Sequence, residues 1–328
     1  MNDINKSVIV LDIGATNIRC ALACKKGLIK KIKEKTNSKK LIPQIKDLIV
    51  RITKSLEEID AIGIAIAGQL DLKKGIAINL PNLEIKHLPI RDLLYDYFKK
   101  PIFLINDCTA AVLGETTFGS FKNTDNIVYV SFGSGIGGGA IVNGTLLMGK
   151  DGNALEIGHM TVDLKGSLTC SCGRKGHWEA YCSGKNIPNF AKFLINNELV
   201  YPSTNLSGLL ESNSLTSEIL FKLAKSGDKS AIAIIEHVGK INTIGIGNII
   251  DLLDPDLIII GGSVALNNPD LILTPIKRNL HNYCVNRVPR IVLASLGEDS
   301  TLLGVVSFIS SNMSVSYTHL TLPTTERV

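Results

Sequence analysis

The sequence has no uninterrupted apolar stretch that approaches the roughly 18 residues needed to span a membrane as a helix. Four residues break the Ile-rich region after residue 241, namely Asn248, Asp251, Asp254 and Pro255. A secretion signal is also missing, because the apolar run at residues 8–11 is short and Asp12 follows it. These absences exclude a membrane-embedded protein, and we expect a cytoplasmic one with no membrane partner.

A disulfide framework and a Walker loop are not indicated either. The chain has seven cysteines, an odd number without an extracellular context, so metal binding is the better hypothesis for some of them. No glycine-rich stretch ends in Gly-Lys-Ser or Gly-Lys-Thr. If phosphates are bound, another kind of turn must bind them.

The length of 328 residues is enough for about two domains, and a composition of 45% hydrophobic and 20% charged residues is that of a globular protein. The formal net charge is +5. Basic residues cluster at 25–40, a pattern that could contact nucleic acid but fits a solvated hairpin or loop face better. We therefore expect no nucleic-acid partner.

One strand–turn–strand unit occurs twice. Apolar residues 7–11 and 18–23 read as strands around the sequence D-I-G-A-T-N, and residues 126–132 and 140–142 read as strands around G-S-G-I-G-G-G. The spacing of about 120 residues predicts two similar α/β halves.

Other segments complete an α/β pattern. Helical spacing or composition predicts helices at 41–56, 90–97, 109–115, 217–226, 230–250 and 301–308. Buried-type strands are predicted at 61–67, 101–105 and 290–295, and immediately before Gly261. Asp107 would then lie where a strand gives way to a helix, the edge at which open α/β sheets bind ligands.

The two glycine turns are candidates for binding phosphate. Gly133, Gly135 and Gly138 match G-x-G-x-x-G, but a strand follows them where a dinucleotide site needs a helix. Backbone N–H groups and the hydroxyls of Thr16 and Ser134 could instead hold an anion, although both turns could also be simple tight hairpins. The carboxylate of Asp12 at such a turn favours a Mg²⁺ ion beside the phosphates.

Six motifs together resemble the ROK family of sugar kinases and repressors. They are D-I-G-A-T-N-I-R, I-N-D-C-T-A-A, S-F-G-S-G-I-G-G-G, E-I-G-H-M, C-x-C-G-x-x-G-H-x-E and I-I-I-G-G-S, in that order from Asp12 to Ser263. The resemblance implies an α/β, actin-like ATPase (ribonuclease H-like) fold whose two domains enclose ATP and sugar in a cleft between them. We expect a smaller domain at 1–117 completed by a helix at 299–312, a larger domain with a zinc-binding insertion at 118–298, and a disordered or non-native tail at 313–328.

The resemblance also implies the binding residues. Those for the nucleotide are Asp12, Gly14, Thr16, Asn17, Arg19, Ser134, Gly135, Gly261 and Gly262. Those for the sugar are Gly68, Asn82, Asn106, Asp107, Glu156, His159 and Glu179. The chain departs from the family pattern at Ala15 and Asn17, where a glycine and a lysine are usual, and at Ser134, where serine replaces threonine.

Asp107 is the predicted catalytic residue. A sugar hydroxyl is a poor nucleophile, so a carboxylate within hydrogen-bond reach must accept its proton during attack on the γ-phosphate. Without the resemblance, Asn106-Asp107 at a strand end would read as a turn or a helix cap.

A metal site is predicted from four side chains. Cys170, Cys172 and His177 surround a glycine turn, and His159 lies upstream, a set suited to tetrahedral structural zinc. The family normally has three cysteines and one histidine, and His177 takes the place of the third cysteine. Buried thiols beside two unrelated histidines are the alternative.

The resemblance implies an ATP- and Mg²⁺-dependent hexose kinase acting on glucose to give glucose 6-phosphate, with a structural Zn²⁺ and a homodimer or homotetramer as the assembly. N-acetylmannosamine, fructose, mannose, glucosamine or allose could replace glucose, and polyphosphate could replace ATP. Two other classes are a sugar-responsive repressor, disfavoured because only eleven residues precede Asp12, and an ATPase or sugar-binding protein without kinase activity, disfavoured by Asp107.

Overall fold

Two five-stranded sheets with the same strand order organise the chain, in the part that the computed structural model describes, residues 7–318. The first sheet has the order β3-β2-β1-β4-β8 and the second β11-β10-β9-β12-β13. In each, three antiparallel strands are extended by two strands that run parallel to the last of them. This confirms the predicted internal repeat. The chain divides into two units, one for each sheet.

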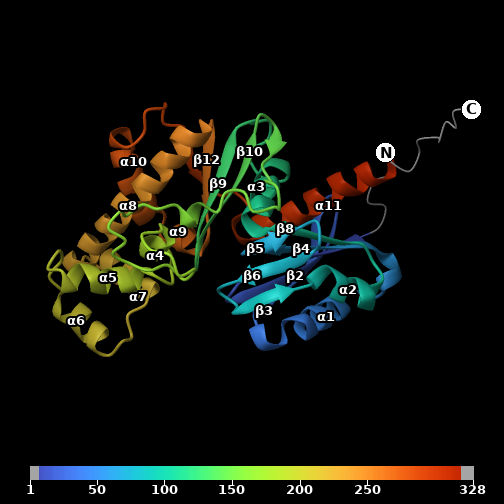
Figure 1. Ribbon diagram of the computed structural model, residues 1–328, viewed down its shortest axis with the longest axis horizontal. Coiled ribbons are helices and arrows are strands. Elements are labelled where there is room, and N and C mark those ends of the chain that lie inside the picture. The colour runs from blue at the N-terminus through green and yellow to red at the C-terminus, as the bar shows by residue number, and fades with distance from the viewer. Residues whose placement is uncertain (1–6, 319–328) are drawn as a thin grey trace, which may run out of the picture. The chain divides into compact units, whose positions relative to one another are not determined.

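Unit 1 is built on the first sheet, drawn in blue and cyan in Figure 1. Its strands are β1 (Ser7–Ile13), β2 (Asn17–Cys24), β3 (Gly27–Lys35), β4 (Ile59–Ile66) and β8 (Ile102–Asn106). A smaller antiparallel sheet consists of β5 (Gln69–Asp71), β6 (Ile76–Leu80) and β7 (Ile85–Leu88). The basic stretch at 25–40 forms most of the edge strand β3, whose lysines are largely exposed.

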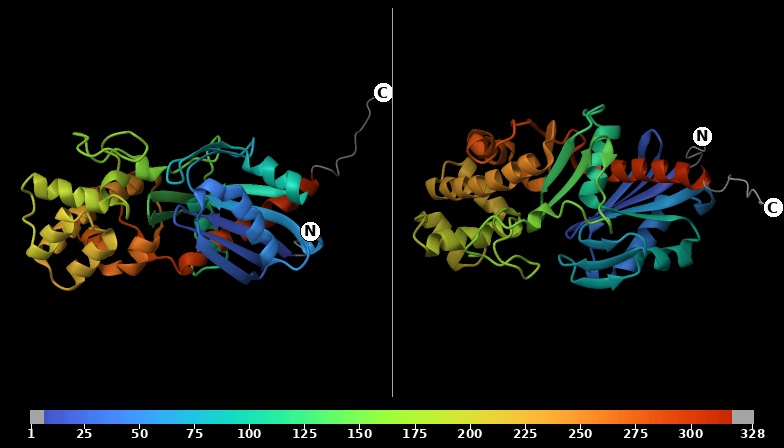
Figure 2. Two further views of the ribbon diagram at one scale, coloured as in Figure 1. Left: turned by 90° about the horizontal axis from the view of Figure 1, so that it is seen from below. Right: turned by 45° about the horizontal axis from the view of Figure 1, so that its top comes forward.

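Helices cover both faces of this sheet (Figures 1 and 2). On one face, Ile9 and Leu11 belong to a core that includes α1 (Leu41–Ile52) and α2 (Ile90–Phe98). On the other, Val8 and Val10 belong to a core with α3 (Asp107–Thr117) and α11 (Ser300–Thr318). The alternation along β1 follows from the two-residue period of a strand that is buried on both sides.

α3 and α11 approach each other closely at two glycines. A Cβ on Gly304 would lie 1.6 Å from the carbonyl oxygen of Ala110, and one on Gly114 would lie 2.0 Å from that of Ser300. Only glycine allows two helix backbones to come this close. The contact attaches the C-terminal helix to the helix that starts with Asp107.

Unit 1 also contains Met148–Ala154, which is distant in sequence. The amide of Asn153 donates to the carbonyl oxygen of Leu70 and accepts from its N–H, both at 2.7 Å, and Leu72 N–H donates to the Asp151 carbonyl. These bonds attach the segment to β5 and the residue after it. The predicted domain at 118–298 therefore differs from the observed unit 2, which lacks this segment.

Unit 2 is built on the second sheet. Its strands are β9 (Ile127–Phe132), β10 (Ile136–Val142), β11 (Thr145–Leu146), β12 (Leu257–Gly261) and β13 (Arg290–Leu293). Its helices are α4 (Glu179–Cys182), α5 (Ile187–Asn196), α6 (Thr204–Glu211), α7 (Ser217–Lys225), α8 (Lys229–Leu253), α9 (Ser263–Asn267) and α10 (Pro269–Asn279). Trp178 is fully buried in its core and packs edge-to-face on Phe132 at 5.7 Å between ring centroids.

Most predicted elements are confirmed, with shifted ends. The helix predicted at 41–56 ends at Ile52, because Thr53 has an extended backbone. The last helix begins at Ser300 and continues to Thr318, past the predicted start of the tail at 313, since the sequence has no proline or glycine there to end it. The rest of the predicted tail lies outside the described residues.

All seven cysteines are free thiols, as the odd count suggested. Among the helices at 7–318, none combines the length and apolar character that crossing a bilayer requires.

Replacing Gly304 by alanine tests the α3–α11 contact. We expect Gly304→Ala to lower the free energy of unfolding by about 1–3 kcal/mol, because the methyl group forces the two helices apart. Urea-induced unfolding measures this change. Gly208→Ala in α6 is the matched control, because its Cβ would meet nothing within 4 Å; it should be neutral or stabilising by up to about 1 kcal/mol. Equal stability of the two variants would contradict the close contact.

Candidate functional site

The parallel strands of unit 1 end together. Ile13 at the end of β1 pairs with Ile66 at the end of β4, which pairs with Asn106 at the end of β8. Asp12 and Asp107 are each one residue away from this row. The predicted site residues of β1 and β8 therefore lie at one edge of one sheet, the edge where α/β proteins bind ligands.

Asn106 and Asp107 have separate tasks at this edge. The side-chain oxygen of Asn106 caps α3 by accepting from the N–H groups of Cys108 at 2.9 Å and Thr109 at 3.1 Å. Asp107 is the first helical residue and is half-buried; its Oδ1 also accepts from Cys108 N–H at 2.9 Å. The helix-cap interpretation of Asn-Asp is thus confirmed, with Asn106 as the cap and Asp107 as the first residue of the helix.

The positive charge of Arg19 acts on the Asp107 carboxyl. Burial raises the pKa of the Asp107 carboxyl above its ordinary value, while the Cys108 N–H and then the Arg19 guanidinium act in the opposite direction. Arg19 is the cross-strand neighbour of Asp12 and forms an ion pair with its carboxylate. A cation is therefore present near two carboxylates at this edge.

The first glycine turn is closed by its own backbone. Gly14 N–H donates to the Asn17 carbonyl at 3.0 Å. Thr36, beyond the end of β3, donates its hydroxyl to the Gly14 carbonyl at 2.7 Å and its N–H to the Thr16 carbonyl at 3.1 Å. Thr36, which lies outside the turn in sequence, therefore holds the turn's backbone. The Thr16 side chain is exposed.

Two further residues predicted to contact sugar also belong to unit 1. Gly68 follows the end of β4 and so lies near the same edge. Asn82 is exposed in the turn between β6 and β7, which connects strands of the smaller sheet.

In unit 2, the second glycine turn follows β9. Gly133 N–H donates to the Gly135 carbonyl at 3.0 Å, and the Ser134 side chain is exposed. Gly262 at the end of β12 has a φ of 83°, and a Cβ there would lie 2.4 Å from the Phe132 carbonyl oxygen. Because β9 and β12 are parallel neighbours, the Ser134–Gly135 and Gly261–Gly262 pairs lie at the same edge of the second sheet.

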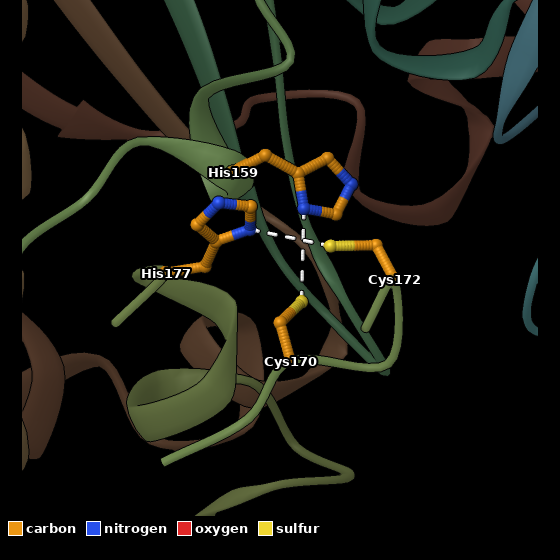
Figure 3. Close-up of side chains that lie close together, drawn as sticks. All are labelled: His159, Cys170, Cys172 and His177. Atoms are coloured by element: carbon orange, nitrogen blue, oxygen red, sulfur yellow. Dashed lines mark hydrogen bonds between the residues drawn. The ribbon is translucent and has the colours of Figure 1, made fainter. Parts of the chain in front are cut away.

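The four predicted metal ligands are brought together (Figure 3). Their ligand atoms all lie within 4.8 Å of one another. His159 Nδ1 is 3.7 Å from Cys170 Sγ, and His177 Nδ1 is 3.3 Å from Cys172 Sγ. The four come from the loop between residues 159 and 177 alone, so a bound ion would fasten that loop.

The distances fit a tetrahedral zinc site. Zinc bonds of about 2.3 Å to sulfur and about 2.0 Å to nitrogen place neighbouring S and N ligands roughly 3.5 Å apart. The two sulfur–nitrogen distances of 3.7 and 3.3 Å bracket that value. Burial and then the His159 ring lower the pKa of His177, which favours the neutral imidazole that binds metals.

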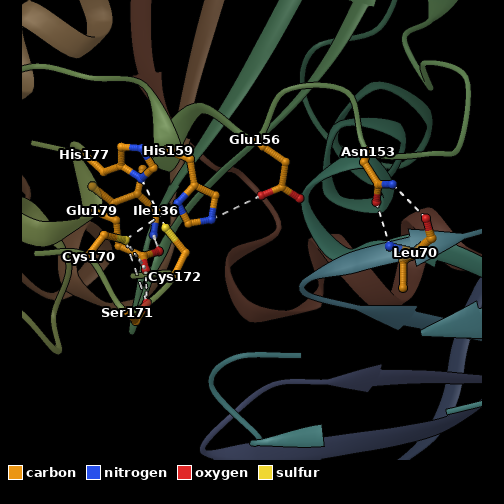
Figure 4. A network of polar contacts seen from close by, with 10 residues as sticks. All are labelled: Leu70, Ile136, Asn153, Glu156, His159, Cys170, Ser171, Cys172, His177 and Glu179. Carbon is orange, nitrogen blue, oxygen red and sulfur yellow. Dashed lines mark hydrogen bonds and ion pairs between the residues drawn. The ribbon is translucent and has the colours of Figure 1, made fainter. Parts of the chain in front are cut away.

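The predicted sugar contacts of unit 2 are adjacent to this cluster (Figure 4). With Nδ1 directed to Cys170, His159 has its Nε2 3.7 Å from Glu156 Oε2. Glu179 is 7% exposed, accepts the N–H of Ile136 at 2.9 Å through Oε2, and accepts the Ser171 hydroxyl at 3.0 Å through Oε1. Both of its oxygens thus already have protein partners.

Two residues that the motifs did not point to also hold the glycine turns, namely Thr36 in unit 1 and Lys185 in unit 2. Lys185 N–H donates to the Ser134 carbonyl at 3.3 Å. The sequence contains a signal only for Lys185, because Ser183-Gly184 before it forms a small-residue turn directly after a short helix.

Comparison with known proteins gives one consistent picture. A model of the ROK family matches residues 8–311. A glucokinase of Pyrobaculum calidifontis is 33% identical and is aligned over 90% of this chain and 93% of its own length. The xylose repressor of Bacillus subtilis is 29% identical over 82% of this chain, but the match spans 66% of the repressor. Among solved structures, a ROK family glucokinase from Streptomyces griseus in complex with glucose and AMPPNP has a TM-score of 0.79 at 26% identity, covering 93% of this chain and 99% of that one.

Proposed function

This chain belongs to the ROK family and has its actin-like ATPase fold, and on that premise we propose that it transfers the γ-phosphoryl group of ATP to glucose. The position of Asp107 is the observation that best supports this proposal. It stands at the carboxyl end of β8, at the first residue of α3, with the Arg19–Asp12 pair at the same sheet edge. Glucokinases are similar over nearly the whole chain, whereas the repressor match leaves a third of the repressor unmatched.

Asp107 acts as the general base in this proposal. Its carboxylate accepts the proton of the sugar hydroxyl as that oxygen attacks the γ-phosphorus. The raised pKa of the buried carboxyl makes it a stronger base than an exposed aspartate. The cap made by Asn106 fixes where α3 starts, and therefore where the carboxylate points.

The nucleotide would be held by the glycine turns. Gly14, Thr16 and Asn17 of the first turn and Ser134 and Gly135 of the second offer N–H and hydroxyl donors to phosphate. The Gly261–Gly262 turn would receive the adenosine. Mg²⁺ bound with ATP supplies charge neutralisation at the phosphates, and Asp12 would hold it, with Arg19 balancing the remaining charge.

Glucose hydroxyls would be held by paired donors and acceptors. The residues assigned to this task are Gly68, Asn82, Asn106, Glu156, His159 and Glu179. Because Asn106 uses its carbonyl oxygen for the helix cap, its amide nitrogen is the group that can donate to a hydroxyl. His159 would present Nε2 and Glu156 its carboxylate, which lie 3.7 Å apart.

Structural zinc would occupy the cluster of His159, Cys170, Cys172 and His177. Four protein ligands complete a tetrahedral shell, so zinc would contribute folding energy and would not touch the reacting atoms. Binding to His159 Nδ1 fixes the ring and leaves Nε2 toward Glu156.

Substrate choice is tested by a coupled assay of ADP release across a panel of sugars. Glucose should give the highest kcat/KM among glucose, N-acetylmannosamine, fructose, mannose, glucosamine and allose. A higher kcat/KM for N-acetylmannosamine would show that the protein is a sugar kinase whose preferred substrate is not glucose. No sugar-dependent ADP release with any of them would reject ATP-dependent phosphorylation of these sugars.

The base is tested by Asp107→Asn. We expect kcat for glucose phosphorylation to fall by about 10²- to 10⁴-fold, the usual contribution of a general base. Calorimetric Kd for glucose should change little, because the amide preserves the side-chain shape. Asp92→Asn, also in the first turn of a helix, is the matched control and should retain activity. Turnover by Asp107→Asn at the parental rate would show that the base lies elsewhere.

The metal assignment is tested by elemental analysis. The purified protein should contain about one zinc per chain, and Cys172→Ser should lose most of it because a hydroxyl is a far poorer zinc ligand than a thiolate. Cys24→Ser, outside the cluster, should keep its zinc. Equal zinc in both variants would mean that the metal is held elsewhere.

A further inference from the structure

The second glycine turn is held by one short segment at three points. Glu179 Oε2 accepts the N–H of Ile136, the residue directly after the turn, at 2.9 Å. Gly184 N–H donates to the Gly133 carbonyl at 2.8 Å, and Lys185 N–H donates to the Ser134 carbonyl at 3.3 Å. Residues 179–185, which form α4 and the turn after it, therefore hold the whole loop from Gly133 to Ile136.

The same segment is attached to the metal cluster. It begins two residues after His177, and Glu179 Oε1 accepts the hydroxyl of Ser171, which lies between the two cysteines. Cys170 Sγ is 3.9 Å from the same oxygen. One carboxylate thus contacts the metal-binding loop with one oxygen and the phosphate turn with the other (Figure 4).

Trp178 keeps this carboxylate in place. Its indole N–H donates to Asn242 Oδ1 of α8 at 2.9 Å, its ring packs on Phe132, and its backbone N–H donates to the Met160 carbonyl at 2.9 Å. A Cβ on Gly245 would lie 2.5 Å from the indole ring, so α8 leaves little space for the ring to move. A shift of the metal-binding loop is therefore passed to Glu179 and not absorbed by rotation of its neighbour.

We propose that the metal cluster sets the shape of the Gly133–Ile136 phosphate turn through Glu179, which makes Glu179 a positioning residue for the nucleotide. The inference rests on the proposed function and deepens it, because it assigns the metal a part in ATP binding. All the contacts lie within unit 2. The sugar contact assigned to Glu179 above is compatible with this role, because each carboxylate oxygen has a second lone pair that can accept from a hydroxyl.

The size of the effect follows from the two hydrogen bonds. Methionine keeps about the length of the glutamate side chain but offers no oxygen acceptor. Glu179→Met therefore leaves both the Ile136 N–H and the Ser171 hydroxyl without this acceptor. We expect about a tenfold rise in the Kd for nucleotide.

The test is calorimetric titration of the full chain with AMPPNP and, separately, with glucose. Glu179→Met should raise the AMPPNP Kd about tenfold in the absence of glucose and keep about one zinc per chain. Ser171→Ala, a milder change, should raise the AMPPNP Kd by about threefold. Thr169→Ala is the matched control in the same loop, since the Thr169 side chain is exposed; it should change neither Kd.

Zinc removal by a chelator completes a thermodynamic cycle. It should raise the AMPPNP Kd of the parent about tenfold and that of Glu179→Met less than about twofold, because the variant has already lost the connection. Additive effects would overturn the proposal, as would a Glu179→Met variant with parental AMPPNP binding. These outcomes leave the kinase assignment intact, whereas a parent that binds no AMPPNP would overturn both.

Discussion

The parallel pairing of β1, β4 and β8 decides where the reactive groups of unit 1 lie. Because these strands run the same way and end at the same level, residues far apart in sequence reach one edge. Asp12 arrives from β1 and Asp107 from β8, while Arg19 is positioned by the antiparallel hairpin partner of β1. A one-residue slip of any strand would turn these side chains to the other face. The chemistry at this edge therefore depends on sheet register.

Unit 2 has the same strand order, but its glycine turn at the corresponding edge is supported by different residues. Its glycine turn follows β9 as the first turn follows β1, but the two turns are held differently. In unit 1 a threonine beyond the edge strand holds the turn. In unit 2 the segment after the metal-binding loop holds it, with Glu179 between the two. One duplicated supersecondary unit thus carries two different supports.

Local patterns predicted much of this architecture. Alternating apolar residues and glycine turns predicted both hairpins, and an Asn-Asp pair after an apolar run predicted the start of α3. Cys-x-Cys spacing with two histidines predicted that four possible metal ligands come together. Contacts between distant segments gave no such signal. Asn153 returns to pair with Leu70, and neither residue has a pattern that indicates this. The contacts of Glu179 with Ile136 and Ser171, which lie in separate loops, also had no signal in the sequence. Long-range pairing depends on the packed fold and not on neighbouring residues.

The central claim is transfer of a phosphoryl group to a sugar, and the most direct measurement follows the phosphorus itself. The protein is incubated with Mg²⁺, glucose and ATP labelled in its γ-phosphate, and the products are separated. The account predicts that the label appears in glucose 6-phosphate in step with ADP. Label found only in inorganic phosphate, or in no product at all, would contradict it.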